Sequence, residues 1–213
     1  MQYVISGPKD YLSQRDNKLY PLSSCNTTSA IMFLNIAKIK YEWDRSRYPQ
    51  AEDALTAITE SPEAYEVMRR DYPWTWDGRQ FLFKPRTVHG MLDWAMQKLV
   101  GWPVARFRMN TPLEELVLQI VRRRPVILAG RLTASGHMVV LVGVETNQDL
   151  SKISSRDEVV AAEIVAWMVN DPFGNWNTNY LQKVGDRVRL TGQSFMKLMR
   201  EFWSPLKWAH LEV

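Results

Sequence analysis

Three chemically versatile residues stand at the ends of apolar segments in this chain of 213 residues. Cys25, the only cysteine, follows "PLSS" and opens an apolar segment; His137 opens the run "HMVVLVGVE", and Asp171 closes the run "EIVAWMVND". A thiol becomes a strong nucleophile when a neighbouring base takes its proton, and a third group can orient that base. The three residue types predict nucleophilic catalysis if the fold brings them together.

Each of the three also has an explanation that involves no chemistry. A lone cysteine is often a small buried apolar residue, a histidine next to glycine can end a strand, and an aspartate before proline is a common turn residue. We favour catalysis because all three stand at the ends of predicted elements, in an order that one fold can assemble.

The first of these elements is a helix that begins at Cys25. Apolar residues recur at roughly helical spacing after it, which predicts a helix over about residues 25–43. Ser23 or Ser24 can cap this helix, because a serine oxygen accepts a hydrogen bond from an unpaired N–H of the first turn. A thiolate at this end faces the positive pole of the helix dipole, which lowers the pKa of the thiol.

The other two elements are strands. Both runs are rich in β-branched residues, and "DPFGNW" follows the second as a turn. If the two strands pair as antiparallel neighbours, the start of one lies beside the end of the other. His137 and Asp171 would then be adjacent, so that His137 takes the proton of Cys25 and Asp171 orients the imidazole ring.

Residues 44–110 predict a helical lobe rather than an independent domain. One or two short helices, broken before Pro62, and an amphipathic helix that stops at Gly101 account for most of it. The next helix has Thr111 as its predicted N-cap, Pro112 at its first position and Glu114 placed for a capping box. Beyond it we predict strands at 126–133, 137–145 and 163–171, a helix at 191–203 and a closing strand at 207–213. Helices followed by an antiparallel sheet indicate an α+β protein, with residues 1–213 as a single domain.

Composition excludes several classes of function. The net charge of +4 permits an acidic partner, but the densest basic cluster, residues 122–124, is too short for a nucleic-acid surface. One cysteine rules out an internal disulfide, and three histidines well apart in sequence argue against a zinc cluster. No apolar run reaches the ~18 residues of a membrane span, and the N-terminus lacks the pattern of a secretory signal. We therefore expect synthesis in the cytoplasm, with release to any other site by a separate factor.

Three segments resemble a known family. "CNTTSAIMFL", "RRRPVILAGRLTASGHMVVLVGVE" and "VNDPFGNW" resemble the peptidases that process the double-glycine leaders of bacteriocins, in particular their stand-alone bacterial and phage branch. The resemblance covers roughly residues 11–43 and 112–180 and implies a papain-like core, with no metal or organic cofactor. It implies Cys25 as nucleophile, His137 as general base and acid, and Asp171 as the orienting residue.

The resemblance also implies a glutamine that stabilises the oxyanion. The candidate is Gln14, eleven residues before Cys25, which is further than is usual in papain-like enzymes. Asn17 and Asp16 are local competitors, and Gln14 could instead be a solvated turn residue.

The remaining candidates are weaker. His89 is expected to be a partly buried polar residue of a helix, and His210 has no acidic neighbour in sequence except Glu212. Trp74 and Trp76 could line a substrate groove, or belong to an aromatic loop that packs on the core.

The main hypothesis is a cysteine peptidase. A basic stand-alone enzyme of this type resembles phage lysis enzymes, so a peptidoglycan stem peptide is the expected substrate (an endolysin-like activity). Acyl transfer or deamidation of a protein target would use the same thioester chemistry. A non-catalytic peptide-binding module of a phage assembly is the alternative from another class. The sequence leaves the scissile bond and the oligomeric state open.

Overall fold

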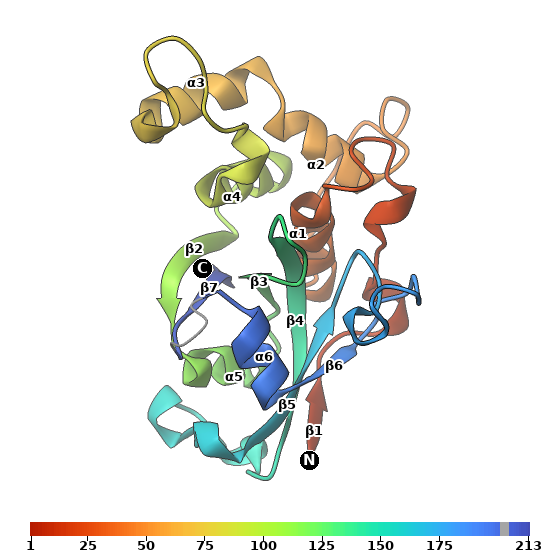
Figure 1. Cartoon of the computed structure of the whole chain (residues 1–213), viewed down its shortest axis with the longest axis vertical. Coiled ribbons are helices and arrows are strands. Elements are labelled where there is room, and N and C mark those ends of the chain that lie inside the picture. Colours follow the sequence, from red (N-terminus) through yellow and green to blue (C-terminus); the bar gives the residue numbers. More distant parts are fainter. Residues whose placement is uncertain (201–204) are drawn as a thin grey trace.

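The computed structural model describes residues 1–200 and 205–213 and confirms the α+β class (Figure 1). Within these residues, seven strands form one antiparallel sheet: β1 (Gln2–Val4), β2 (Ala105–Thr111), β3 (Val126–Gly130), β4 (His137–Thr146), β5 (Ile164–Asn170), β6 (Val188–Thr191) and β7 (Lys207–Glu212). The α-helices are α1 (Cys25–Ile36), α2 (Ala51–Thr59), α3 (Pro62–Asp71), α4 (His89–Val100), α5 (Leu113–Val121) and α6 (Gly192–Leu198).

The strand order is β2-β7-β3-β4-β5-β6, with β1 paired to β4. Strand β4 is the centre of the sheet: β5 pairs along one edge, while β3 and β1 pair with successive parts of the other edge. A side chain at Gly143 would collide with β1, because its Cβ would lie 2.6 Å from the carbonyl oxygen of Tyr3. Glycine at this position therefore allows β1 to join the sheet.

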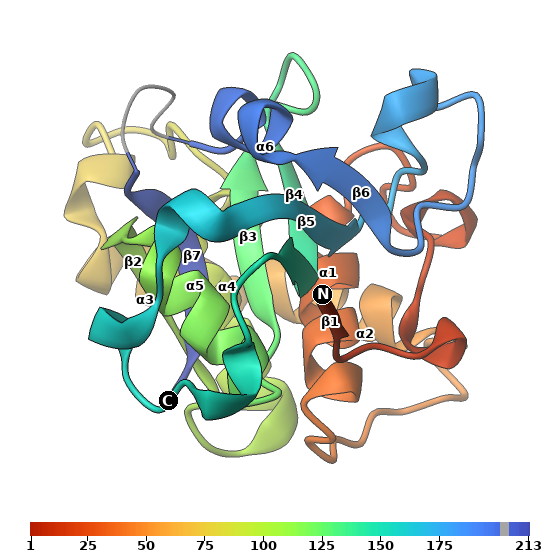
Figure 2. The same ribbon diagram turned by 90° about the horizontal axis from the view of Figure 1, so that it is seen from below.

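Helices cover both faces of the sheet. Strands alternate their side chains, so Val140, Val142 and Met168 face Met32 and Ile36 of α1. The opposite face forms the largest apolar cluster with α5 and α6. Figure 2 shows α1 and α5 on either side of β3 and β4. Because α1 is enclosed by the sheet and by α2 and α4, nearly all of its residues are buried.

The lobe is built from α2, α3 and α4, which lie together at the top of Figure 1. Helix α4 packs on α2 and on strand β2, while α3 and α4 enclose a small apolar cluster of their own. The helical part ends earlier than the predicted boundary at residue 110, because residues 105–111 form β2 and pair with β7 at the edge of the sheet. The lobe is thus continuous with the sheet through β2.

Two helix boundaries differ from the predicted ones. The first helix ends at Ile36 rather than near Trp43, because Lys38 adopts a left-handed backbone with φ 59° and turns the chain. Ile39 and Trp43 still pack on the buried cluster around α1, so the apolar pattern continues beyond the helix. Thr111 is the last residue of β2 rather than an N-cap, and α5 starts after Pro112 without a side-chain cap.

The last helix and the last strand agree with the predicted ones. The predicted strand at 207–213 is β7, which inserts between β2 and β3. The predicted helix at 191–203 forms as α6 over Gly192–Leu198, and residues 201–203 of that prediction lie outside the described part of the chain. Across residues 1–200 and 205–213, no helix is long and apolar enough to cross a membrane.

Candidate active site

Cys25 is the first residue of α1, and polar side chains of the same helix fix its position. Ser29 Oγ donates a hydrogen bond to the carbonyl oxygen of Met138 in β4, at 3.1 Å. The hydroxyl groups of Thr27 and Thr56 lie 2.8 Å apart and tie α1 to α2. Buried hydroxyls with partners hold the helix in register against the sheet. The start of α1 is thereby fixed beside the start of β4.

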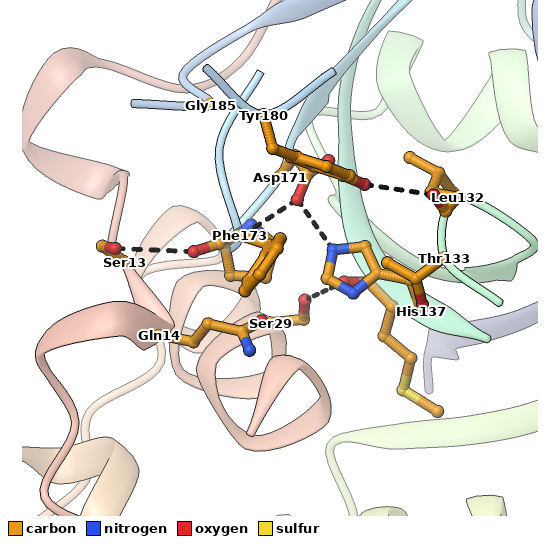
Figure 3. Close-up of polar contacts among 12 residues, drawn as sticks. Ser13, Gln14, Ser29, Leu132, Thr133, His137, Asp171, Phe173, Tyr180 and Gly185 are labelled. Carbon is orange, nitrogen blue, oxygen red and sulfur yellow. Dashed lines mark hydrogen bonds and ion pairs between the residues drawn. The ribbon is translucent and has the colours of Figure 1, made fainter. Parts of the chain in front are cut away.

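The structure brings His137 and Asp171 together. Val140 pairs with Asn170 in the antiparallel β4–β5 ladder, so the first residue of β4 faces the residues that follow β5. His137 Nε2 lies 2.7 Å from Asp171 Oδ1, and both side chains are buried. The same oxygen accepts a hydrogen bond from the backbone N–H of Phe173, at 2.9 Å. Figure 3 shows both contacts. An ionised carboxylate only accepts, so Nε2 carries a proton and Nδ1 is the ring nitrogen left to interact with Cys25.

Hydrogen bonds also hold the backbone of Asp171 in place. Its N–H donates to the carbonyl oxygen of Gly185 at 2.8 Å, and the hydroxyl of Tyr11 donates to its carbonyl oxygen at 3.2 Å. The N–H of Gly185 in turn donates to the Tyr11 oxygen. A Cβ at Gly185 would lie 2.2 Å from the Asp171 carbonyl oxygen, which explains why this position is a glycine.

Two aromatic rings cover the His137–Asp171 pair. Phe173 and Tyr180 meet the His137 ring edge-on, with centroids 6.3 and 6.5 Å away. The guanidinium of Arg15 lies 3.8 Å from the centroid of Phe173, and its Nε donates to the Phe173 carbonyl oxygen at 2.6 Å. Burial and the neighbouring Asp171 carboxylate raise the pKa of Tyr180, so this ring stays uncharged. The rings limit the access of water to the pair.

The electrostatics of Cys25 and His137 favour a thiolate beside an imidazolium. Burial on its own raises the pKa of the Cys25 thiol, but His137 and the N–H groups of Met138 and Asn26 outweigh it and hold the pKa below its usual value. Burial on its own lowers the pKa of His137, but Cys25 and Asp171 together raise it to about 10. Since the thiol then loses its proton at a lower pH than the imidazolium does, the two groups coexist as an ion pair between these pKa values.

Gln14 reaches the same site from the N-terminal segment. It opens a short 3₁₀ helix (Gln14–Asp16), its side chain is only 1% exposed, and it lines the cleft that contains Cys25 and His137. Its Nε2 donates one hydrogen to the carbonyl oxygen of Pro21 at 3.1 Å, which leaves the second amide hydrogen available. Figure 3 shows the side chain directed from its loop toward His137.

The local competitors of Gln14 are placed differently. Asn17 is buried, but its Nδ2 donates to Ser24 Oγ at 2.8 Å and to Thr28 Oγ1 at 2.9 Å, so both amide hydrogens are used. These bonds tie the Gln14 segment to the start of α1. Asp16 is exposed and does not line the cleft.

The cleft has a volume of about 610 Å³ and a basic lining. Cys25, His137 and Gln14 lie on its wall together with Arg86, Arg200 and the loop between β3 and β4. Among the residues that the structure describes, no aspartate or glutamate lines it. Arg86 is paired with Glu60 at 2.9 Å, whereas Arg200 forms no ion pair with any described carboxylate. The cleft is therefore suited to neutral or anionic groups.

The two tryptophans suggested for substrate binding lie elsewhere. Trp74 is 60% exposed on the lobe and meets Phe83 edge-on, and Trp76 packs on Phe81 beneath Arg69. Neither ring lines the cleft that contains Cys25. The structure does not bring them to the other site residues.

His210 departs from its expected surroundings. The only acidic neighbour expected from the sequence was Glu212, yet His210 Nδ1 lies 2.5 Å from Asp93 Oδ1 of α4. Helix α4 was predicted correctly, but the packing of this helix against the β2–β7 pair is a tertiary feature that no local pattern records. Tyr11, Arg15 and Tyr180 were missed for the same reason, since each acts through contacts distant in sequence.

A cluster of three or more possible metal ligands is absent from the described residues.

Comparison with known families adds an independent finding. The model of a family described as Peptidase_C39 like family matches residues 9–201, which is most of the chain. The match spans Gln14, Cys25, His137 and Asp171. Comparisons with curated proteins and with solved structures gave no match.

Proposed function

Because this chain belongs to the Peptidase_C39-like family it is a cysteine peptidase, and we propose that Cys25, His137 and Asp171 carry out its reaction. The observation that supports these roles most directly is the buried 2.7 Å contact between His137 Nε2 and Asp171, with Cys25 on the wall of the same cleft and near enough to raise the pKa of His137. This is the geometry of a nucleophile, a base and a group that orients the base.

The proposed reaction has two halves. In the first, the Cys25 thiolate attacks the carbonyl carbon of the scissile amide and forms a C–S bond. The C–N bond then breaks while the His137 imidazolium gives its proton to the departing amine. In the second, His137 takes a proton from a water molecule that attacks the thioester. The C–S bond then breaks, which releases the carboxylic product and the Cys25 thiolate, and the proton that remains on His137 restores the ion pair. Asp171 keeps Nε2 protonated throughout, so Nδ1 performs both proton transfers.

We further propose that Gln14 donates to the oxyanion of both tetrahedral intermediates, together with the backbone N–H of Cys25. The free amide hydrogen and the buried position of Gln14 in the cleft support this role. Donors held in place before reaction stabilise developing charge without reorganisation. Gln14→Ala should therefore lower kcat by about 10²-fold or more, with a smaller change in KM.

The control for this variant is the rate at which iodoacetamide alkylates Cys25. An oxyanion donor is not needed for alkylation, so Gln14→Ala should alkylate at the wild-type rate. A parallel loss of alkylation and hydrolysis would instead indicate a disturbed nucleophile.

The substrate we propose is the stem peptide of peptidoglycan. The chain carries a net charge of +4, and Arg200 stands in the cleft without a described ion-pair partner. Stem peptides carry free carboxylates, and the cell wall is anionic, so charge favours both encounter and binding. In this proposal a separate lysis factor would bring the enzyme to the wall.

Purified cell walls of several chemotypes provide the test. Wild-type protein should clear a wall suspension and release fragments with one new amine and one new carboxylate per cut, as determined by mass spectrometry. If the protein clears no wall chemotype but still cleaves an unstructured protein, the wall substrate is excluded while the peptidase activity stands. Released ammonia or a new amide bond would instead identify a deamidase or an acyl transferase. The position of Cys25 and His137 on the wall of one cleft, with His137 lowering the pKa of the Cys25 thiol, argues against a binding module without catalysis.

A further inference from the structure

The turn that precedes α1 carries the hydrogen-bond partner of Gln14. Residues 20–23 form this turn, which is closed by the backbone N–H of Ser23 donating to the carbonyl oxygen of Tyr20 at 2.8 Å. Pro21 lies inside the turn, and its carbonyl oxygen accepts the hydrogen bond from Gln14 Nε2 at 3.1 Å. The position of the Gln14 amide therefore depends on the conformation of the turn.

The turn has an unfavourable backbone conformation at its first residue and little contact with the core. Tyr20 is left-handed, with φ 55°, which steric contacts make unfavourable for a residue with a side chain. Such a residue keeps that conformation only where its surroundings hold it. Tyr20 and Leu22 are 40% and 78% exposed, so burial in the core does not supply that support. The support comes instead from another part of the chain.

Arg86 of the lobe contacts both ends of the turn. It lies in the 3₁₀ helix Pro85–Thr87, between α3 and α4. Its guanidinium carbon lies 4.1 Å from the centroid of the Tyr20 ring, and its Nη1 donates to Ser23 Oγ at 3.0 Å. Its Nε forms the 2.9 Å ion pair with Glu60, so the guanidinium is itself held from the lobe. Arg86 thus links the turn to the lobe.

The main chain of Arg86 makes a separate contact. Its carbonyl oxygen accepts a hydrogen bond from Asn26 Nδ2, directly after the nucleophile, and a change of the Arg86 side chain leaves this acceptor in place. Burial raises the pKa of the Cys25 thiol, His137 and two N–H groups lower it, and the Arg86 guanidinium is not among these influences. The side chain of Arg86 therefore acts on the turn without acting on the thiol.

We propose that Arg86 is a positioning residue for the oxyanion hole, which holds the turn at residues 20–23 so that the Pro21 carbonyl fixes the Gln14 amide on the cleft wall. The inference rests on the proposed function, since it explains how the oxyanion donor is held in place. Arg86 does not touch the reacting atoms and acts through Pro21 and Gln14. The lobe thereby contributes to catalysis.

The test compares two reactions of Cys25 that differ in their need for an oxyanion hole. N-acetylglycine p-nitrophenyl ester acylates the thiolate: a C–S bond forms at the carbonyl carbon, and p-nitrophenolate leaves from the tetrahedral intermediate. Iodoacetamide alkylates the same thiolate by displacement of iodide, without an oxyanion. The measured quantities are the two second-order rate constants, from p-nitrophenolate absorbance and from intact mass.

Arg86→Met keeps an unbranched side chain but removes the guanidinium. It should lower the acylation rate constant about tenfold, and by no more than Gln14→Ala does, because a small displacement of a catalytic donor slows the reaction. Alkylation should keep its wild-type rate and pH profile. Arg86→Lys keeps the charge but lacks the planar fork that serves the ion pair and the turn together, so it should recover little of the loss.

Lys84→Met is the matched control. The Lys84 ammonium also lies near the Tyr20 ring, 6.0 Å from its centroid, but among the described residues it donates no hydrogen bond to the turn. Its loss should leave both rate constants unchanged. Glu60→Gln, which removes only the ion pair with Arg86, should show a smaller loss of acylation than Arg86→Met. Melting temperatures establish that each variant is folded.

A double variant and its outcomes separate this inference from the proposed function. Gln14→Ala combined with Arg86→Met should acylate as slowly as Gln14→Ala alone, because Arg86 has no further effect once the amide is absent. A loss in Gln14→Ala with wild-type acylation in Arg86→Met would overturn the role of Arg86 alone. Equal losses of acylation and alkylation in Arg86→Met, losses that multiply in the double variant, or full recovery in Arg86→Lys would also overturn it. Acylation that Gln14→Ala leaves unchanged would defeat the proposed oxyanion donor, and the role of Arg86 with it.

Discussion

Replacing Cys25 by alanine should abolish peptide hydrolysis, with a loss in kcat on the order of 10⁵- to 10⁶-fold, as measured when the nucleophile of a triad is removed. Alanine cannot form the thioester, and no other cysteine exists in the chain to substitute for it. The residual rate would come from binding and oxyanion stabilisation alone. Hydrolysis of a wall suspension or of a protein substrate by purified protein measures the effect.

Two controls distinguish chemistry from folding. Alanine is a favourable helix residue, so Cys25→Ala at the start of α1 should keep its melting temperature. Cys25→Ser preserves shape and hydrogen bonding, but its hydroxyl does not ionise at the pH values where the thiol does, so it too should be inactive. Substantial activity in either variant would show that Cys25 is not the nucleophile.

Replacing Asp171 by asparagine should be the next most damaging change. Asp171 Oδ1 accepts from both His137 and the Phe173 N–H, and an asparagine carbonyl oxygen can accept both bonds. The negative charge is lost, however, and an asparagine that rotates to present its NH₂ group would select the wrong tautomer of His137. We expect kcat/KM to fall by about 10² to 10⁴-fold, the upper limit being the loss seen when the tautomer is wrong.

The pH dependence of activity shows whether the lost charge of Asp171 causes this fall in kcat/KM. In the wild type, activity should rise with pH as the thiol ionises and fall as the imidazolium loses its proton, near the His137 pKa of about 10. Asp171 contributes to raising that pKa because its charge and its hydrogen bond stabilise the imidazolium. Asp171→Asn should therefore move the alkaline limb to lower pH. Asp157→Asn, which removes an exposed carboxylate remote from the cleft, should leave the profile unchanged.

An alkaline limb that stays in place in Asp171→Asn would contradict this account of the His137 pKa. A uniform loss of activity at every pH, accompanied by a lower melting temperature, would point instead to a structural role for Asp171 next to Tyr11 and Gly185.

The parts of the site that could be predicted are those that interrupt a local pattern. His137 and Asp171 stand at the ends of two apolar runs, and antiparallel pairing of adjacent strands is the simplest topology. The structure pairs those strands and brings the two residues together. Cys25 was identifiable because it precedes an apolar segment of roughly helical spacing and follows a pair of serines. The α+β class follows from the same order of helices and strands.

The parts that could not be predicted depend on tertiary packing. Lys38 ends the first helix through a left-handed turn, while the apolar periodicity continues to Trp43 because Ile39 and Trp43 pack on the same cluster outside the helix. Strand β2 carries mostly polar and charged residues at the sheet edge, so it has no clear strand pattern. The contact between Asp93 and His210 joins a lobe helix to the last strand, 117 residues apart.

Gln14 could be named as a candidate from the sequence, but its place in the site depends on tertiary packing. Its position eleven residues before Cys25 was an obstacle to its assignment from spacing alone. In the structure, hydrogen bonds of Asn17 to Ser24 and Thr28 fold the intervening segment back onto α1, so the long spacing still places Gln14 on the cleft wall. The residues between Gln14 and Cys25 form a loop, so Gln14 reaches the cleft despite its separation from Cys25 in sequence.

The central claim is that Cys25 is an activated thiolate paired with His137, and its alkylation by iodoacetamide as a function of pH tests this claim most directly. Since the chain has one cysteine, the mass increase on the intact protein reports Cys25 alone. Half-maximal reactivity well below the free-thiol reference of about 8.5, shifted upward in His137→Ala, is the predicted result. A wild-type Cys25 that titrates at or above the free-thiol value, and does so equally in His137→Ala, would contradict the account.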